Sequence, residues 1–199
     1  DRLRSEYYAL ILFAASGMML LASTVELITI YISLELTTLP LAALATFLRT
    51  SRSAESGMKL LLLSAVSSAV LLYGMVLIYG FTGTTTLVGI SERISMDLSS
   101  GGFTLANSAL LFGTVLLIAG FGFKIGSVPF QMWVPDVYEG APTPITAYLS
   151  VASKAAGFAV IMRVFYESLS IQGFSTDWGN LFAVLSALSM TIGNLIAVR

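Results

Sequence analysis

Long apolar runs dominate this sequence, and several exceed the roughly 18 to 20 residues that a helix needs to cross a bilayer core. Hydrophobic residues make up 56% of the 199 residues and charged residues only 11%, whereas soluble domains have roughly 25% charged residues. Because an open strand edge cannot satisfy its hydrogen bonds in lipid, the spans should be helices. The sequence therefore predicts an all-α polytopic transmembrane helix bundle. We expect six spans, at about 6–22, 25–48, 57–80, 105–124 with an irregular continuation to about 138, 144–165, and 180–198.

The connections suggest one membrane domain over 1–199. The longest of them, 81–104, is rich in Gly, Thr and Ser and is expected to be a surface loop with a partly amphipathic turn. The chain starts at Asp1 and stops at Arg199 directly after an apolar run. We therefore expect it to be a segment of a longer protein.

The basic residues near the span ends indicate an orientation. Six lie on one side of the predicted topology and two on the other, and an even span count returns both termini to the same side. The side with more Lys and Arg, which includes both termini, is predicted to be cytoplasmic. The first group is Arg2, Arg4, Arg49, Arg52, Lys59 and Arg199, and the second is Arg93 and Arg163.

Charge and composition exclude several classes of function. The formal net charge of −1 does not favour a nucleic-acid partner. The chain has no Cys and no His, so thiolate chemistry, iron–sulfur clusters, His-ligated haem and the usual zinc sites lack their ligands. It also has no Gly-rich dinucleotide fingerprint after a strand. We expect no metal, cofactor or redox centre in this chain.

Three ionisable residues lie deep within apolar runs: Glu35, Lys124 and Lys154. Translocon scales put a central charge at roughly +2.5 to +3.5 kcal/mol, so such residues usually face a bundle interior or a water path and have a partner. We interpret them as functional in preference to ion pairs that only fix helix packing. Glu26 and Lys59 lie near span ends, where an ordinary interfacial position is favoured.

The backbone around Lys124 is unusual, because Gly122, Gly126 and Pro129 surround it, with Gly120 one turn earlier. This composition predicts a broken helix near 124–129. Irregular backbone at membrane depth is tolerated where it is buried or lines a cavity, and the ends of half-helices then offer dipoles to ions.

Two further features leave alternatives open. Pro40 lies five residues after Glu35 and should leave the carbonyl of Leu36 without a backbone donor; a functional kink and an ordinary transmembrane proline are equally compatible with it. A group of hydroxyls at near-helical spacing favours close helix packing over a hydroxyl-lined water path. These hydroxyls belong to Ser64, Ser67 and Ser68.

The segment VPFQMWVPDVYEGAPTPITAYLSVASK, Val128 to Lys154, resembles the antiporter-like membrane subunits of NADH-quinone oxidoreductase (respiratory complex I), and within that family the subunit N group. PDVYEGAPTP is its most specific part; Thr143 is expected to cap the helix that Pro144 begins. SLELTTLPL, Ser33 to Leu41, resembles the family's helix with a buried glutamate, which maps onto Glu35.

The resemblance implies a fold and an activity. Residues 1–165 would form the first of two inverted five-helix repeats, and 180–198 the first helix of the second. The subunit would move protons through Glu35, Lys124 and Lys154 while other subunits use NADH and quinone. Gln131 stands where relatives commonly have His. Other membrane subunits, lipid and protons are the implied partners, in a cell inner membrane.

Two alternative functions remain from the residues themselves. The same charges would serve a subunit of a cation/proton antiporter, although PDVYEGAPTP looks more like the quinone-reductase subunit. A non-pumping structural subunit is the other alternative. It predicts that neutral, size-matched replacements of Glu35 and Lys124 together change little except stability.

Overall fold

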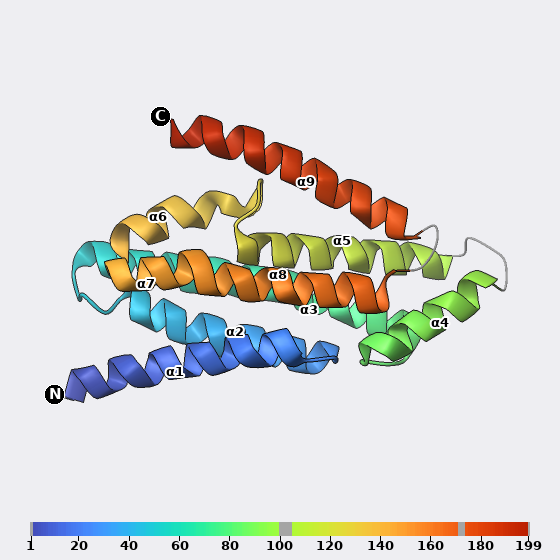
Figure 1. Ribbon diagram of the computed structural model, residues 1–199, viewed down its shortest axis with the longest axis horizontal. Coiled ribbons are helices and arrows are strands. Elements are labelled where there is room, and N and C mark those ends of the chain that lie inside the picture. Colours follow the sequence, from blue (N-terminus) through green and yellow to red (C-terminus); the bar gives the residue numbers. More distant parts are fainter. Residues whose placement is uncertain (1, 100–104, 171–173, 199) are drawn as a thin grey trace.

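The computed structural model describes residues 2–99, 105–170 and 174–198, and this part of the chain is a bundle of helices joined by short turns (Figure 1). Six segments are long and apolar enough to cross a membrane, as predicted. The α-helices are α1 (Arg2–Ser23), α2 (Leu27–Ala45), α3 (Ser51–Thr82), α4 (Leu87–Ser99), α5 (Leu105–Ile125), α6 (Trp133–Gly140), α7 (Thr143–Tyr148), α8 (Lys154–Arg163) and α9 (Phe174–Ala197).

The long helices run side by side along the length of the bundle (Figure 1). Helix α3 packs against α2 and α5, α1 packs against α2, and α8 contacts α1 and α5. The two ends of the described chain lie at the same end of the molecule, with α4 at the opposite end (Figure 1). This arrangement agrees with the even number of predicted spans.

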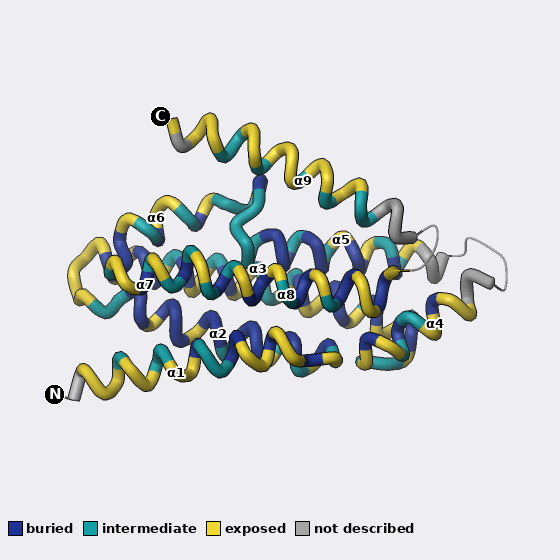
Figure 2. The backbone as a smooth tube through the Cα atoms, viewed as in Figure 1, coloured by how far each residue is buried: buried dark blue, intermediate teal, exposed yellow. Residues whose placement is uncertain are grey.

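Burial separates an apolar interior from an apolar exterior. Buried positions face the centre of the bundle and exposed ones face outward (Figure 2). The fully buried side chains include Leu117, Phe121 and Phe165, while Leu12, Leu62 and Val66 are more than half exposed. A bundle whose outer surface is apolar is suited to lipid, because apolar side chains lose no hydrophobic free energy when they contact lipid tails.

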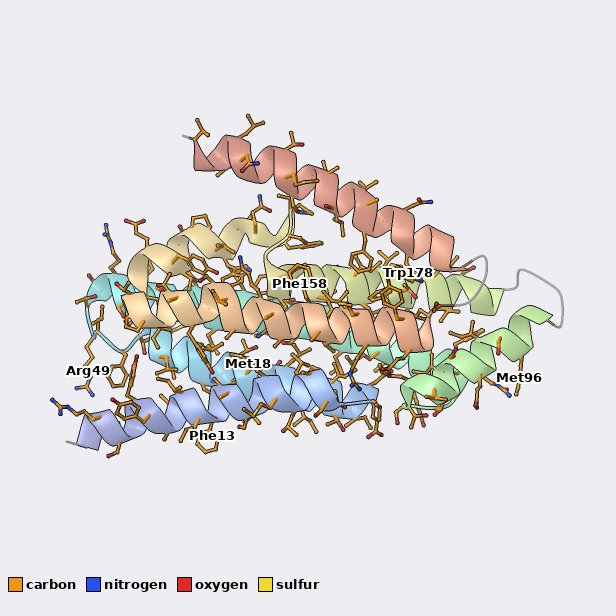
Figure 3. All side chains as sticks on the ribbon, viewed as in Figure 1. Phe13, Met18, Arg49, Met96, Phe158 and Trp178 are labelled. Carbon is orange, nitrogen blue, oxygen red and sulfur yellow. The ribbon has the colours of Figure 1, made fainter. Side chains whose placement is uncertain are left out.

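Helix α9 lies along one side of the bundle (Figure 1). Trp178 near its start (Figure 3) packs on the π-helical turn Val164–Ser168 that follows α8. Its indole nitrogen donates a 2.9 Å hydrogen bond to the carbonyl of Leu169. Its ring also packs against Phe165 with centroids 5.3 Å apart. These contacts attach the start of α9 to the rest of the bundle.

The prediction of a loop over 81–104 is wrong for 87–99, which form α4. Leu87, Ile90 and Ile94 recur at helical spacing and are 0%, 1% and 1% exposed. This amphipathic face packs on the bundle, so tertiary burial stabilises a short helix that its Gly- and Thr-rich flanks obscure in the sequence. Residues 100–104 lie outside the described part.

The turns at the α4 end of the bundle are joined to each other. The backbone N–H of Leu27 donates to the carbonyl of Thr85, and that of Leu87 donates to Val25, each at 2.9 Å. The hydroxyl of Thr85 donates a 2.7 Å bond to Glu26. Together these bonds tie the α1–α2 turn to the α3–α4 turn.

At the opposite end, α6 lies against the start of α3. Lys59 forms ion pairs with Asp136 at 2.7 Å and with Glu55 at 2.8 Å, and Arg52 pairs with Glu139 at 3.2 Å. The segments that the charge distribution predicts on one side of the membrane are therefore joined directly. Which side faces the cytoplasm stays a prediction.

Candidate functional site

Helix α5 ends in a defined stop at Gly126. This glycine has φ +71°, its N–H donates to the carbonyl of Phe123 at 3.1 Å, and the N–H of Ser127 donates to Gly122 at 2.9 Å. This pair of bonds is a Schellman motif, which needs a left-handed residue and favours glycine there. These two bonds give donors to the carbonyls of Gly122 and Phe123, which have no partner within the helix because it ends here.

The chain then turns and resumes as α6. The indole N–H of Trp133 donates a 2.9 Å hydrogen bond to the carbonyl of Phe123, and the backbone N–H of Val128 donates to the Ser189 hydroxyl of α9 at 3.0 Å. Pro129 follows in the turn, after a cis peptide bond. The structure therefore has the helix break expected near 124–129.

The glycines near Lys124 have different structural roles. Only Gly126 adopts the left-handed conformation. A Cβ on Gly122 would lie 2.9 Å from atoms of Ser127 and Phe130, so this residue allows the turn to fold back on α5. A Cβ on Gly120 would meet Leu71 of α3 at 2.7 Å. Gly120 therefore allows close packing of two helices and is not part of the break.

Lys124 lies in the last turn of α5, near the carbonyls at the negative end of the helix dipole. Its ammonium donates a 2.6 Å hydrogen bond to Oγ1 of Thr38 on α2. Glu35 lies one turn before Thr38 on the same helix, and its carboxylate is not within the 4.0 Å of an ion pair with the Lys124 ammonium. The structure thus brings Glu35 and Lys124 to the same interior region and places Thr38 as the direct contact.

A cavity of about 30 Å³ lies beside the Lys124 side chain. This volume exceeds the roughly 10 to 15 Å³ that a buried water molecule needs. The hydroxyls in its mainly apolar wall offer such a water hydrogen-bond partners. Ser64, Ser67 and Ser68, for which the sequence favoured close helix packing, line this cavity. Ser67 also donates a 3.3 Å hydrogen bond to the carbonyl of Gly120 on α5. The polar residues of the wall are Thr38, Ser64, Ser67, Ser68, Lys124 and Ser153.

Helix α2 continues through Pro40 to Ala45. The Thr37 and Thr38 hydroxyls before the proline donate to the carbonyls of Ser33 and Leu34. Thr38 therefore contributes to its own helix and accepts from Lys124 at the same time. The proline lies one turn after Glu35 but does not end the helix.

Lys154 begins α8 and reaches back to the break. Its ammonium lies 5.6 Å from the centre of the Tyr138 ring, and a Cβ on Gly126 would be 3.9 Å from its Nζ. The five residues before it, Leu149–Ser153, form a π-helical turn that the sequence did not predict. Such wide turns inside helices are often found at functional sites.

The two lysines therefore flank one structural element, the break between α5 and α6. Gly157 of α8 lies close to the stem of Lys124, because its Cβ would be 3.7 Å from the lysine Cγ. Sequence reasoning missed Thr38 and Tyr138 as partners of these charges, and Trp133 as the donor to the end of α5. The expectation that Thr143 caps the next helix is wrong, because Thr143 is the first residue of α7 and Pro142 precedes it as the cap.

Comparisons with known proteins identify the family. Residues 23–199 match the transmembrane family described as NADH:quinone oxidoreductase/Mrp antiporter. NADH-quinone oxidoreductase subunit N of Dehalococcoides mccartyi is 50% identical over 99% of this chain and 41% of its own length. The corresponding subunit of Heliobacterium modesticaldum is 48% identical over 99% of this chain and 40% of its own length.

Solved structures agree with these relatives. A chain of respiratory complex I from Thermus thermophilus with bound aureothin superposes with a TM-score of 0.78 at 37% identity, covering 98% of this chain and 39% of that one. A chain of the Mrp complex from Dietzia has the same fold, with a TM-score of 0.67 at 22% identity over 78% of this chain and 28% of that one. The present chain spans about two fifths of the length of the curated relatives it matches. It belongs to the NADH:quinone oxidoreductase/Mrp antiporter transmembrane family.

Proposed function

We propose that this chain forms part of a proton-translocating membrane subunit of NADH-quinone oxidoreductase. Electron transfer from NADH to quinone takes place in other subunits, and this chain carries protons through Glu35, Lys124 and Lys154. The relatives named as subunit N of that enzyme support the assignment. So does the placement of both lysines at a helix break inside a membrane bundle.

The observation that carries the proposal is the environment of the Lys124 ammonium. It combines a hydroxyl partner at 2.6 Å, a cavity of about 30 Å³ lined in part by hydroxyls, and the carboxylate of Glu35 one turn away from that partner on α2. A protonated lysine beside water can release a proton to that water and later take one back. A packing lysine needs a partner, but it does not need a cavity with several hydroxyls.

A change in the distance between Glu35 and Lys124 changes the proton affinity of the lysine. Moving one charge through about 150 mV requires roughly 3.5 kcal/mol, at about 2.3 kcal/mol per 100 mV. A unit charge pair at about 4 Å is worth about 4 kcal/mol at an effective dielectric constant of about 20. Closing and opening this pair therefore changes the energy of the proton by the amount that translocation needs. Lys124 then passes the proton across the break toward Lys154.

A cation/proton antiporter is the second candidate, because the family includes the Mrp antiporters and the Dietzia Mrp complex shares the fold. The closer sequence relatives favour the quinone-reductase subunit. The two functions differ in what drives the proton. Pumping that depends on NADH oxidation supports the first candidate, and proton movement that depends on a Na⁺ or K⁺ gradient supports the second.

The test is proton pumping by the complete complex in vesicles after Lys124→Met. We expect loss of pumping with assembly retained, whether or not NADH oxidation slows as well. Arg93→Met, on the exposed side of α4 and outside the cavity, is the matched control for loss of a cationic side chain and should keep pumping. Unchanged pumping at an unchanged oxidation rate in Lys124→Met would make Lys124 a packing residue and favour the structural-subunit alternative.

The proposal includes a location and partners. The complex lies in a cell inner membrane, with the end of the bundle that carries Arg52 and Lys59 toward the cytoplasm. The apolar outer faces contact lipid and the other membrane subunits. No redox centre is assigned to this chain.

A further inference from the structure

Tyr138 belongs to the PDVYEGAPTP segment but has no place in the function proposed so far. It lies on α6, directly after the helix break. Its ring lies under the ammonium of Lys154 at 5.6 Å, and it meets the indole of Trp133 edge to face with centroids 6.2 Å apart. Trp133 in turn lines the Lys124 cavity and bonds to the end of α5.

The ring of Tyr138 is placed to stabilise the charged form of Lys154. A cation within about 6 Å of an aromatic centroid is attracted by the electron-rich face, and more strongly when both groups are removed from water. Among the described residues, the structure gives Lys154 no ion pair and no hydrogen bond to a side chain. The aromatic face is therefore its principal protein partner.

The hydroxyl of Tyr138 adds a second observation. Its oxygen is buried and has no hydrogen-bond partner in the part of the chain that the structure describes. Buried polar groups are nearly always satisfied by protein or by ordered water. The described part of the protein offers this hydroxyl no partner, which leaves it able to bind a water molecule.

The backbone fixes Tyr138 in this place from both sides. The hydroxyl of Thr146 on α7 donates a 3.3 Å hydrogen bond to its carbonyl, and Lys59 of α3 pairs with Asp136, two residues earlier, at 2.7 Å. The π-helical turn of Leu149–Ser153 directly precedes Lys154. Ring and ammonium are thus held by separate elements, α6 and the start of α8.

We infer that Tyr138 is a positioning residue for proton transfer, whose ring holds the Lys154 ammonium and whose hydroxyl binds the water through which Lys154 exchanges its proton. This inference rests on the proposed function for its consequence in pumping. The contact between ring and ammonium is testable without pumping.

The experiment compares Tyr138→Phe with Tyr138→Leu in the complete complex. The first variant keeps the ring and removes only the hydroxyl, and the second removes both. Tyr73→Leu is the matched control, because Tyr73 is 55% exposed on the outer surface of α3. Each variant is assayed for the ratio of protons pumped to NADH oxidised, and for the rate at which acetic anhydride acetylates Lys154, read by mass spectrometry.

Loss of the ring should raise acetylation, because the reagent attacks the neutral amine and the ring favours the ammonium. We expect an increase of about two- to thirtyfold in Tyr138→Leu and little change in Tyr138→Phe or Tyr73→Leu. An unchanged acetylation rate in Tyr138→Leu would overturn the role of the ring. The acetylation rate tests the contact between ring and ammonium even if the Lys124→Met experiment refutes the proposed function, because it does not depend on pumping.

Loss of the hydroxyl should lower pumping. We expect a several-fold lower proton-to-NADH ratio in Tyr138→Phe and in Tyr138→Leu. When either is combined with Lys154→Met, the ratio should be no lower than in Lys154→Met alone, because Tyr138 acts through Lys154. A wild-type ratio in Tyr138→Phe would overturn the role of the hydroxyl. An additional loss in the double variants would mean that Tyr138 acts elsewhere.

Discussion

Replacing Gly120 with alanine tests how closely α3 and α5 must pack beside the Lys124 cavity. The added Cβ would lie 2.7 Å from Cβ and Cδ1 of Leu71 and 3.2 Å from its Cα, whereas ordinary contacts are 3.4 to 4 Å. Two of these atoms belong to or adjoin the backbone, so rotation of the side chain cannot relieve the contact. The helices must separate locally by about 0.7 Å to restore van der Waals distance, and overpacking of this kind costs about 1 to 3 kcal/mol.

The separation has a second consequence. The hydrogen bond from Ser67 to the carbonyl of Gly120 is already 3.3 Å long and would not survive it, so the wall of the cavity would open. We expect Gly120→Ala to reduce the yield of assembled complex, to speed its inactivation on heating and to impair pumping. Because membrane complexes unfold irreversibly, the half-life at a fixed elevated temperature is the appropriate measure.

Gly80→Ala is the control for this prediction, because Gly80 also lies on α3 but a Cβ there meets nothing within 4 Å. It should assemble, pump and resist heating at least as well as wild type, since alanine favours helix more than glycine does. If Gly120→Ala behaves like Gly80→Ala in all three measurements, the close approach of α3 and α5 does not limit stability, and the reasoning fails.

Three other substitutions probe the site. Thr38→Val removes the acceptor of the 2.6 Å bond from Lys124. Since hydrogen bonds to charged groups are worth about 1.5 to 3 kcal/mol, pumping in vesicles should slow. Thr114→Val is the control and should not slow pumping, because the Thr114 hydroxyl bonds only within its own helix. Trp133→Phe removes the indole donor to the Phe123 carbonyl, which keeps the N–H of Gly126. It should cost about 0.5 to 1.5 kcal/mol, seen as a shorter half-life on heating; an unchanged half-life would contradict this. Gly126→Ala forces a side chain into φ +71° and against Val134 at 2.9 Å, which should cost about 1 to 2 kcal/mol or more and reduce assembly in blue-native gels, whereas Gly193→Ala should assemble normally.

The spans were predictable because their signal is the length of apolar runs, which depends on the bilayer and not on tertiary detail. The exception is α4, a 13-residue helix that is too short to cross a membrane. Its stability comes from burial of Leu87, Ile90 and Ile94, so a window chosen for spanning helices misses it. The helical spacing of these three residues was the available signal.

The charged residues and the break of the site were also predictable, because a buried charge is costly and Gly and Pro mark broken helices. Their partners were not. Thr38 is 86 residues from Lys124 in the sequence, and nothing local marks one threonine among many as the acceptor. The π-helical turn before Lys154 has no compositional signature at all, since Leu149–Ser153 would read equally well as an α-helix.

The wide turn at Leu149–Ser153 changes how residues on this span should be counted. An α-helix advances by 100° per residue, and a π-turn inserts an extra residue into that progression. Positions before and after the turn therefore cannot be assigned to one face by a single helical wheel. A scan of substitutions along Thr143–Arg163 should be phased in two parts, one ending at Tyr148 and one starting at Lys154, and a second π-helical turn at Val164–Ser168 shifts the phase again. A one-residue deletion inside the turn is expected to change the direction of the Lys154 side chain only slightly. A one-residue deletion within α8 is expected to change the directions of the side chains that follow it more.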